Sequence, residues 1–234
     1  MKKRLLNYQG IGIVALFLVC ATEFWNCSSS PTNPKYISEG IIEYKATPLD
    51  PDNSMASLAP SKMLVKFKDN YCVAEMTAGM GLFSTSFISD PVHKNFIHMV
   101  KLINQKFAVV MGPDSLRKEV DADPKPIIEK LPETKKIAGY NCNKARVSYA
   151  NNASPAFDIW YTKELNIEHP NWSNPYHEIE GVLMEYQLKR YGLELRFNAV
   201  SVTKASIDES IFSLPSEYKL ISRVEMASKF SDFK

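Results

Sequence analysis

Apolar and polar residues alternate along much of the chain, and this pattern predicts a mainly β protein. Every second residue from Ala145 to Tyr149 is apolar, and the alternation returns from Phe157 to Tyr161 after a connection rich in Asn, Ser and Pro. Alternation of this kind is typical of a strand with one buried face, and the turn residues reverse the chain. The two runs therefore predict a β-hairpin with one apolar face.

The same alternation recurs elsewhere, whereas helical signals are few. Asp114 is a suitable N-cap for a short helix over residues 115–120, and three prolines in residues 123–132 leave room for at most one more helical turn. Residues 168–180 are predicted to be irregular, and residues 217–224 to form a last short strand. The other predicted strands are 40–47, 62–68, 71–77, 82–88, 96–102, 106–111, 182–189 and 193–199.

About ten strands with so little helix predict the form of the sheet, since average domains hold more helix than strand. A soluble monomer rarely exposes an apolar patch beyond a few hundred Å², so the sheet is expected to curl. We predict a strongly curved antiparallel sheet, an open or half β-barrel, with one or two short helices. The apolar side chains expected on its concave face are Tyr44, Met63, Val65, Phe67, Phe157, Ile159, Tyr161, Met184, Tyr186 and Phe197.

The N-terminus has the composition of an export signal. Three basic residues precede an apolar run over residues 10–21, which is shorter than the roughly 20 residues that cross a bilayer. Two processing sites compete. Residues 19–21 suit the peptidase that releases soluble proteins, whereas residues 24–27 resemble a loose lipobox that ends at Cys27.

The small, polar segment after Cys27 favours lipidation there, because such tethers join an acylated cysteine to a folded body. Several acyl chains would anchor the protein stably to a membrane. We therefore expect a lipoprotein of the bacterial cell envelope, periplasmic or at the outer membrane; a secreted protein is the alternative. The predicted organisation is an export signal over 1–26, a flexible tether over 27–38, one β domain over 39–224 and a frayed tail over 225–234.

Charge and cysteine content narrow the partners and the chemistry. Without residues 1–26 the chain keeps 25 basic and 25 acidic residues, so it lacks the basic surface that nucleic acid requires. We expect a monomer that binds no nucleic acid.

Cys72 and Cys142 would close a loop of about 70 residues if they formed a disulfide. In an oxidising compartment this bond would stabilise the fold by roughly 4 kcal/mol. Two separate thiols are the other possibility.

Four short segments resemble a family of uncharacterised bacterial envelope proteins, a domain of unknown function grouped with the lipoprotein carriers LolA and LolB. The segments are Glu39–Lys45, Ile137–Cys142, Ile159–Thr162 and Phe212–Pro215, and the resemblance extends over most of the mature chain. It implies an open, strongly curved antiparallel sheet whose concave apolar face is lidded by one or two short helices and accepts acyl chains, so that the ten apolar side chains named above would bind the ligand. It brings no catalytic residue.

Signatures of catalysis and metal binding are missing from the sequence. Three S-x-x-K matches lack their companion motifs, and there is no P-loop or dinucleotide fingerprint. We expect no enzyme, no metal and no cofactor, but a protein that binds a lipid, or the acyl groups of a lipoprotein, on the concave face. The alternative is a surface-exposed lipoprotein that acts as an interaction module with a filled core. The four histidines, His93, His98, His169 and His177, lack ligand spacing.

Overall fold

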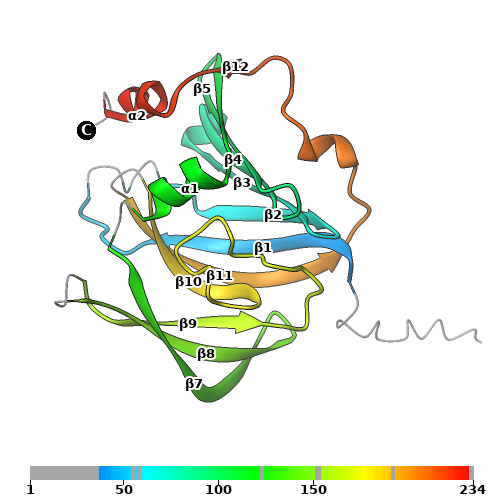
Figure 1. The fold of residues 1–234 in the computed structure, drawn as a ribbon, viewed down its shortest axis with the longest axis vertical. Helices are drawn as coiled ribbons and strands as arrows, with labels where there is room; N and C mark the ends of the chain where they lie inside the picture. Colours follow the sequence, from blue (N-terminus) through cyan, green and yellow to red (C-terminus); the bar gives the residue numbers. More distant parts are fainter. Residues whose placement is uncertain are drawn as a thin grey trace, which may run out of the picture. The chain divides into compact units, whose positions relative to one another are not determined.

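The chain divides into two compact units, residues 1–32 and residues 33–234, and every residue described below lies in the second. The computed structural model describes residues 37–53, 56, 59–121, 124–150, 154–190 and 193–231 (Figure 1). The expected export signal, the lipidation of Cys27 and the tether up to residue 36 lie outside the described residues.

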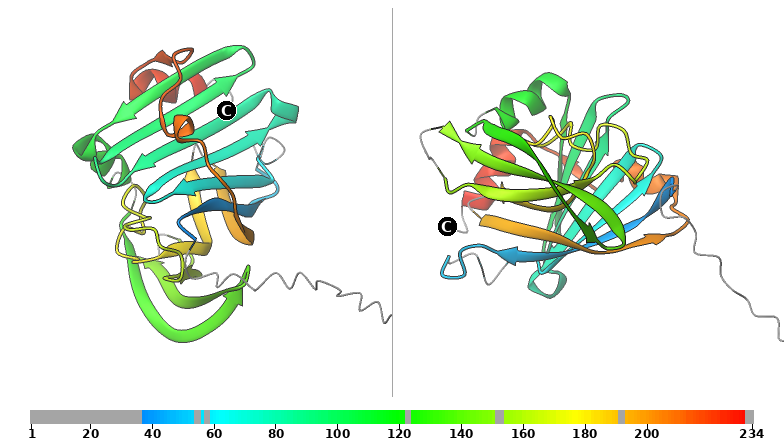
Figure 2. Two further views of the ribbon diagram at one scale, coloured as in Figure 1. Left: turned by 90° about the vertical axis from the view of Figure 1, so that its right-hand side faces the viewer. Right: turned by 90° about the horizontal axis from the view of Figure 1, so that it is seen from below.

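One sheet of twelve strands forms this unit, in the order β12-β6-β5-β4-β3-β2-β1-β11-β10-β9-β8-β7. Among the strands that the structure describes, only β12 and β6 pair in parallel, and the sheet curves without closing into a barrel, as the sequence predicted (Figures 1 and 2). The strands are β1 Glu39–Pro48, β2 Lys62–Lys68, β3 Tyr71–Ala78, β4 Phe83–Asp90, β5 Asn95–Leu102, β6 Gln105–Met111, β7 Pro126–Ile137, β8 Tyr140–Tyr149, β9 Phe157–Thr162, β10 Val182–Arg190, β11 Leu193–Lys204 and β12 Lys219–Leu220.

The two hairpins expected from alternation and turn chemistry are confirmed. β8 and β9 pair with Ala145 opposite Ile159 and Val147 opposite Phe157. β2 and β3 pair through the tight turn at Asp69, whose φ of 51° lies in the left-handed region. In β2, β8 and β9 the period-two pattern placed the buried face of the strand correctly.

The prediction for residues 123–132 was wrong, because these residues begin a long strand, not a helical turn. β7 runs over Pro126–Ile137 and pairs with β8, and its register shifts between Leu131 and Thr134, around Pro132. β7 is the edge of the sheet, where a proline removes no hydrogen bond to a further strand. The prolines therefore mark an edge strand with a bulge.

The helices also differ from the prediction. α1 spans Pro113–Val120, with Gly112 at the N-cap and Pro113 in the first turn, so Asp114 lies inside the helix. Up to residue 231, the last one that the structure describes, the residues expected to form a last strand and a frayed tail contain the two-residue β12 and then α2, which spans Arg223–Ser231. Met226 on α2 is buried against β5 and β6, and this contact holds the helix on the sheet.

The outer face of β3 to β6 is covered by the segment between β11 and β12, drawn in orange in Figure 2. This segment includes the 3-10 turn η5 at Glu209–Phe212. Ion pairs join Lys68 to Glu209 at 2.8 Å and Lys106 to Glu217 at 3.1 Å. Its apolar side chains explain why residues 82–88 are apolar on both faces: Ile211, Phe212, Leu214 and Tyr218 pack against Val73, Ile88, Met99 and Ala108.

Candidate ligand-binding cavity

The segment 163–181 crosses the concave face of the sheet and is drawn in yellow in Figure 1. Asn171, which is buried, donates from its side-chain amide to the carbonyl oxygens of Ile179 and Gly181, at 2.8 Å each. Trp172 donates from Nε1 to the hydroxyl of Ser89 on β4 at 2.7 Å. We call this segment the inner strap, because it packs on the sheet from within.

The inner strap can return into β10 only because Gly181 has no side chain. A Cβ at this position would lie 2.6 Å from the carbonyl oxygen of Thr162 and 3.0 Å from the ring of Tyr161. Leu165 and Ile167 of the strap are buried among residues of β1, β2 and β11, and Tyr176 and Ile179 among residues of β8 and β9. The strap therefore fills the concave face of the sheet, which we call the trough, over β1, β2, β8, β9 and β11. It leaves the part of the trough over β3 to β5 uncovered.

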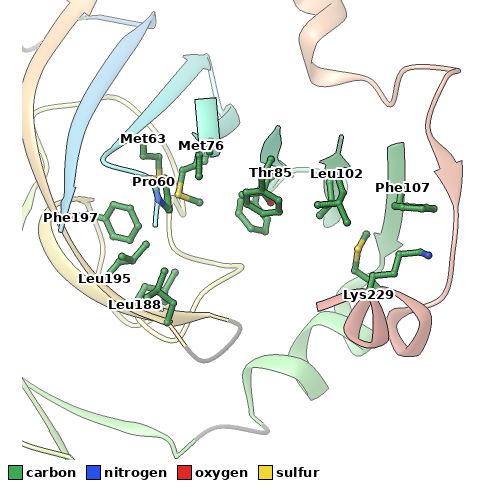
Figure 3. Close-up of a pocket in the computed structure, with 18 of the residues that line it drawn as sticks. Pro60, Met63, Met76, Thr85, Leu102, Phe107, Leu188, Leu195, Phe197 and Lys229 are labelled. Atoms are coloured by element: carbon green, nitrogen blue, oxygen red, sulfur yellow. The ribbon is translucent and has the colours of Figure 1, made fainter. Parts of the chain in front are cut away.

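A cavity of about 400 Å³ occupies this uncovered part of the trough. Its walls come from β2 to β6 on one side, from β10 and β11 on the other, from Ser173 and Asn174 of the inner strap, and from α2 at one end. Figure 3 shows the lining side chains in a band from Phe197, Leu195 and Leu188 to Phe107 and Lys229. Nearly all of them are apolar, so the cavity resembles a site for a hydrocarbon.

The polar side chain of Thr85, which lines the cavity on β4, and its neighbour His98 have partners within the protein. The Thr85 hydroxyl lies 3.0 Å from Nε2 of His98 and donates to the carbonyl oxygen of Met99 at 3.3 Å. The His98 ring stacks on Phe87, with their centroids 4.6 Å apart. These contacts keep the polar groups of Thr85 and His98 hydrogen-bonded within the protein, so this part of the wall presents an apolar surface to the cavity.

One charged side chain lines the cavity, at the end closed by α2. The Lys229 ammonium lies 4.3 Å from the centre of the Phe107 ring, within the range of a cation–π contact. α2 is fastened to α1 by Arg223, whose Nε lies 3.0 Å from Glu119 Oε2. The second helix therefore holds both an apolar residue, Met226, and an ammonium group at the same end of the trough.

Three of the ten predicted ligand-binding residues line the cavity: Met63, Tyr186 and Phe197. The other seven pack in the core on either side of the inner strap, and the Tyr44 hydroxyl donates to the carbonyl oxygen of Leu183 at 2.8 Å. Ligand binding by any of the ten stays a prediction. The seven core residues are Tyr44, Val65, Phe67, Phe157, Ile159, Tyr161 and Met184.

Sequence reasoning missed most of the wall formed by β3, β4 and β5. Their inward side chains follow the same period-two pattern, so the signal was present. What the pattern could not show is where the inner strap lies, and this decides which apolar positions stay uncovered. The missed residues of these three strands are Ala74, Met76, Ala78, Phe83, Thr85, Phe87, Phe96, Val100 and Leu102.

The structure holds Cys72 and Cys142 as free thiols, the possibility that the sequence left open beside a disulfide. Burial raises the pKa of the Cys72 thiol to about 12 and that of Cys142 to about 11. Burial also raises the pKa of Tyr186 in the cavity wall. These groups are therefore neutral at physiological pH, and neutral thiols are poor nucleophiles.

The described residues contain no group of three or more His, Cys, Asp or Glu side chains placed to hold a metal ion. Within the same part of the chain, no helix has the length and apolar character needed to span a membrane. What the arrangement offers chemically is an apolar enclosure, with an ammonium at one end.

Fold and cavity together define a class of protein: an open, curved antiparallel β-sheet with an apolar trough on its concave face. Comparison with known proteins gives a match of residues 83–171 to the model of a family described as N-glycanase peptide, N-terminal domain. The matched part runs from β4 into the inner strap. The match is thus to one domain of an enzyme, and it assigns no catalytic role to this chain.

A solved structure titled "Structure of PNGF-II in C2 space group" is similar in fold, with a TM-score of 0.52 and 15% sequence identity. The similarity covers 82% of this chain and 32% of PNGF-II, so this chain spans about a third of that protein's length. The MucA/MucB complex of Pseudomonas aeruginosa matches with a TM-score of 0.36 and 7% identity, over 81% of this chain and 60% of that one, which does not establish a common fold. No curated protein matches the chain in sequence.

None of these similarities is to LolA or LolB, so the relationship to lipoprotein carriers stays a prediction. What the comparisons support is a shared β fold with the N-terminal domain of a glycanase. At 15% identity this similarity concerns the fold alone.

Proposed function

We propose that this protein binds a hydrophobic ligand, an acyl chain of a lipid or of a lipoprotein, in the cavity between β3 to β5, the inner strap and α2. The observation that carries the proposal is the apolar cavity itself. Its volume of about 400 Å³ lies within the roughly 300–1,000 Å³ of small-molecule sites. An apolar lining of this kind favours apolar ligands.

The energetics favour a chain of methylene groups. Each buried CH₂ contributes about 0.8 kcal/mol, so a sixteen-carbon chain gains roughly 12 kcal/mol before the cost of ordering it. Burial of half of such a chain still leaves a useful affinity. The protein would act without catalysis, as a monomeric carrier or receptor comparable to LolA and LolB.

Titration with a fluorescent fatty acid tests the proposal. The protein is expected to enhance the probe's emission with saturation at one probe per chain, and an unlabelled sixteen-carbon fatty acid should displace it. The emission rises because the cavity removes the probe from water. If emission stays that of free probe at micromolar protein, the cavity does not serve lipids and the proposal fails.

We also propose that the protein is anchored in the bacterial envelope through lipidated Cys27. Cys27→Ala is expected to abolish incorporation of a palmitate analogue in the living host and to move the protein from the membrane fraction to the soluble fraction. Labelling that persists in the variant would show that the acyl group is attached elsewhere.

The match to the glycanase domain favours a second candidate, a module that recognises glycoproteins beside a glycan-removing enzyme. In that case the apolar residues of the trough would serve only the stability of the fold, and the loops would bind the glycoprotein. A pull-down with a denatured N-glycosylated protein, compared with the same protein stripped of its glycans, separates the two candidates. Retention only with glycans, together with no uptake of fatty acid, would favour the second.

A further inference from the structure

Two neighbouring turns at one end of the trough expose large apolar side chains. Met80, in the 3-10 turn η3 at Gly79–Gly81, is fully exposed, and Leu82 and Ile103 are 56% and 57% exposed. The backbone N–H of Ile103 donates to the carbonyl oxygen of Leu82 at 2.7 Å, so the turns form one rim. Gly79, Leu82 and Ile103 also line the cavity, which makes this rim part of its border.

The backbone of this rim is unusual for the residues it carries. Met80 and Ile103 have φ angles of 53° and 54°, in the left-handed region that favours Gly and Asn. A β-branched residue such as isoleucine is an outlier there. Since strained backbone concentrates at functional sites, the presence of apolar residues at these two turn positions points to a use for their exposed side chains.

The charged residues of the two turns are lysines. Residues 77–84 contain no charged side chain, and residues 100–107 contain only Lys101 and Lys106, of which Lys106 pairs with Glu217 at 3.1 Å. Lys229 contributes its ammonium at the α2 end of the same cavity. Exposed apolar side chains interspersed with lysines are the composition of surfaces that bind a bilayer with anionic headgroups.

We infer that this rim, formed by Met80, Leu82 and Ile103, docks the protein on a lipid surface that contains anionic headgroups. The inference rests on the proposed function. An acyl chain that moves directly from a bilayer into the cavity never has to cross water, and docking at the cavity border allows this. A bilayer fits better than a protein partner, because the apolar groups are separate protruding turns and not a broad flat patch.

Met80→Asn is the variant that tests the inference. Asparagine accepts the left-handed backbone, and Met80 is not part of the cavity wall, so folding and ligand capture should persist. The matched control is Val92→Asn, because Val92 is 60% exposed and lies in the β4–β5 turn, at the other end of these strands. The protein used is the unit 33–234, which contains every described strand and helix with their core clusters, with its fold checked by circular dichroism.

The measurements are co-sedimentation with vesicles of phosphatidylcholine, with and without phosphatidylglycerol, and fatty-acid titration in solution. The wild-type unit should bind the anionic vesicles, and Met80→Asn should weaken this binding by roughly fivefold to tenfold through lost insertion of an apolar side chain. Val92→Asn should bind as the wild type does. The affinity for fatty acid should be the same in the wild-type unit, in Met80→Asn and in Val92→Asn.

Three results would overturn the docking inference. One is a wild-type unit that takes up fatty acid but ignores vesicles, which would leave the proposed function standing. Another is an equal loss of vesicle binding in Met80→Asn and Val92→Asn. The third is concentration-dependent self-association that Met80→Asn removes, because the rim would then bind a second copy of the chain. Vesicle binding without any fatty-acid uptake would instead refute the proposed function alone.

Discussion

Phe67→Ala is expected to lower the free energy of unfolding by about 3–5 kcal/mol, the range for removal of a buried aromatic side chain. The Phe67 side chain is fully buried, and its ring lies in the core cluster that joins β1, β2, β10 and β11. Gly40 lies opposite it on β1, close enough that a Cβ on Gly40 would be 3.3 Å from the ring. The neighbouring backbone is thus fixed around the ring, and it cannot collapse to fill the space.

Urea unfolding followed by circular dichroism measures this effect. Val110→Ala is the control, since Val110 is half exposed on the outer face of β6 and its loss should change the free energy by no more than about 0.5 kcal/mol. A loss below 1 kcal/mol for Phe67→Ala would show that this ring lines an open space and does not fill the core.

Ala74→Phe is expected to reduce fatty-acid affinity by at least about tenfold, because the new ring would occupy the space of several methylene groups. Ala74 is half buried on β3, in the cavity wall, with Val65 and Phe87 opposite it on the neighbouring strands. Since the ring enters an existing cavity, the protein should remain folded with a similar free energy of unfolding. Titration of the variant with the fluorescent fatty acid provides the measurement.

The matched control adds the same bulk on the other face of the sheet. Val110→Phe places a ring on the outer face of β6, away from the cavity, and should leave fatty-acid affinity unchanged. Unchanged affinity in Ala74→Phe, with the fold intact, would contradict the assignment of the ligand to this cavity. If Ala74→Phe aggregates, Ala74→Leu takes its place in the titration. Leucine fills less of the cavity and should weaken fatty-acid binding by a smaller factor.

The strand pattern predicted the sheet well because strand and turn signals agreed. The β8–β9 hairpin follows from the alternation around Ala145 and Ile159 together with a turn-rich connection. β7 was missed because the prolines of residues 123–132 were considered only as a limit on a helix, although an edge strand tolerates them. α2 was missed because its apolar residues give little periodic signal: Met226 is buried, whereas Val224 is 80% exposed.

The cavity was harder to predict than the sheet. Alternation identifies which side chains point to the concave face, as with Phe67 and Phe197, but not which of them remain uncovered. That depends on the inner strap, whose position is set by the Asn171 hydrogen bonds and the contact of Trp172 with Ser89, none of which follows a repeating pattern. Phe67 consequently belongs to the core, while Phe197 lines the cavity.

The central claim is that the uncovered part of the trough holds an acyl chain. Native mass spectrometry of the whole protein, purified from its own host under gentle conditions, tests this most directly. We predict an additional mass that corresponds to one fatty acid or phospholipid, released on denaturation and retained to a much smaller extent by Ala74→Phe. A single ligand-free mass, unchanged when lipid is added, would contradict the account.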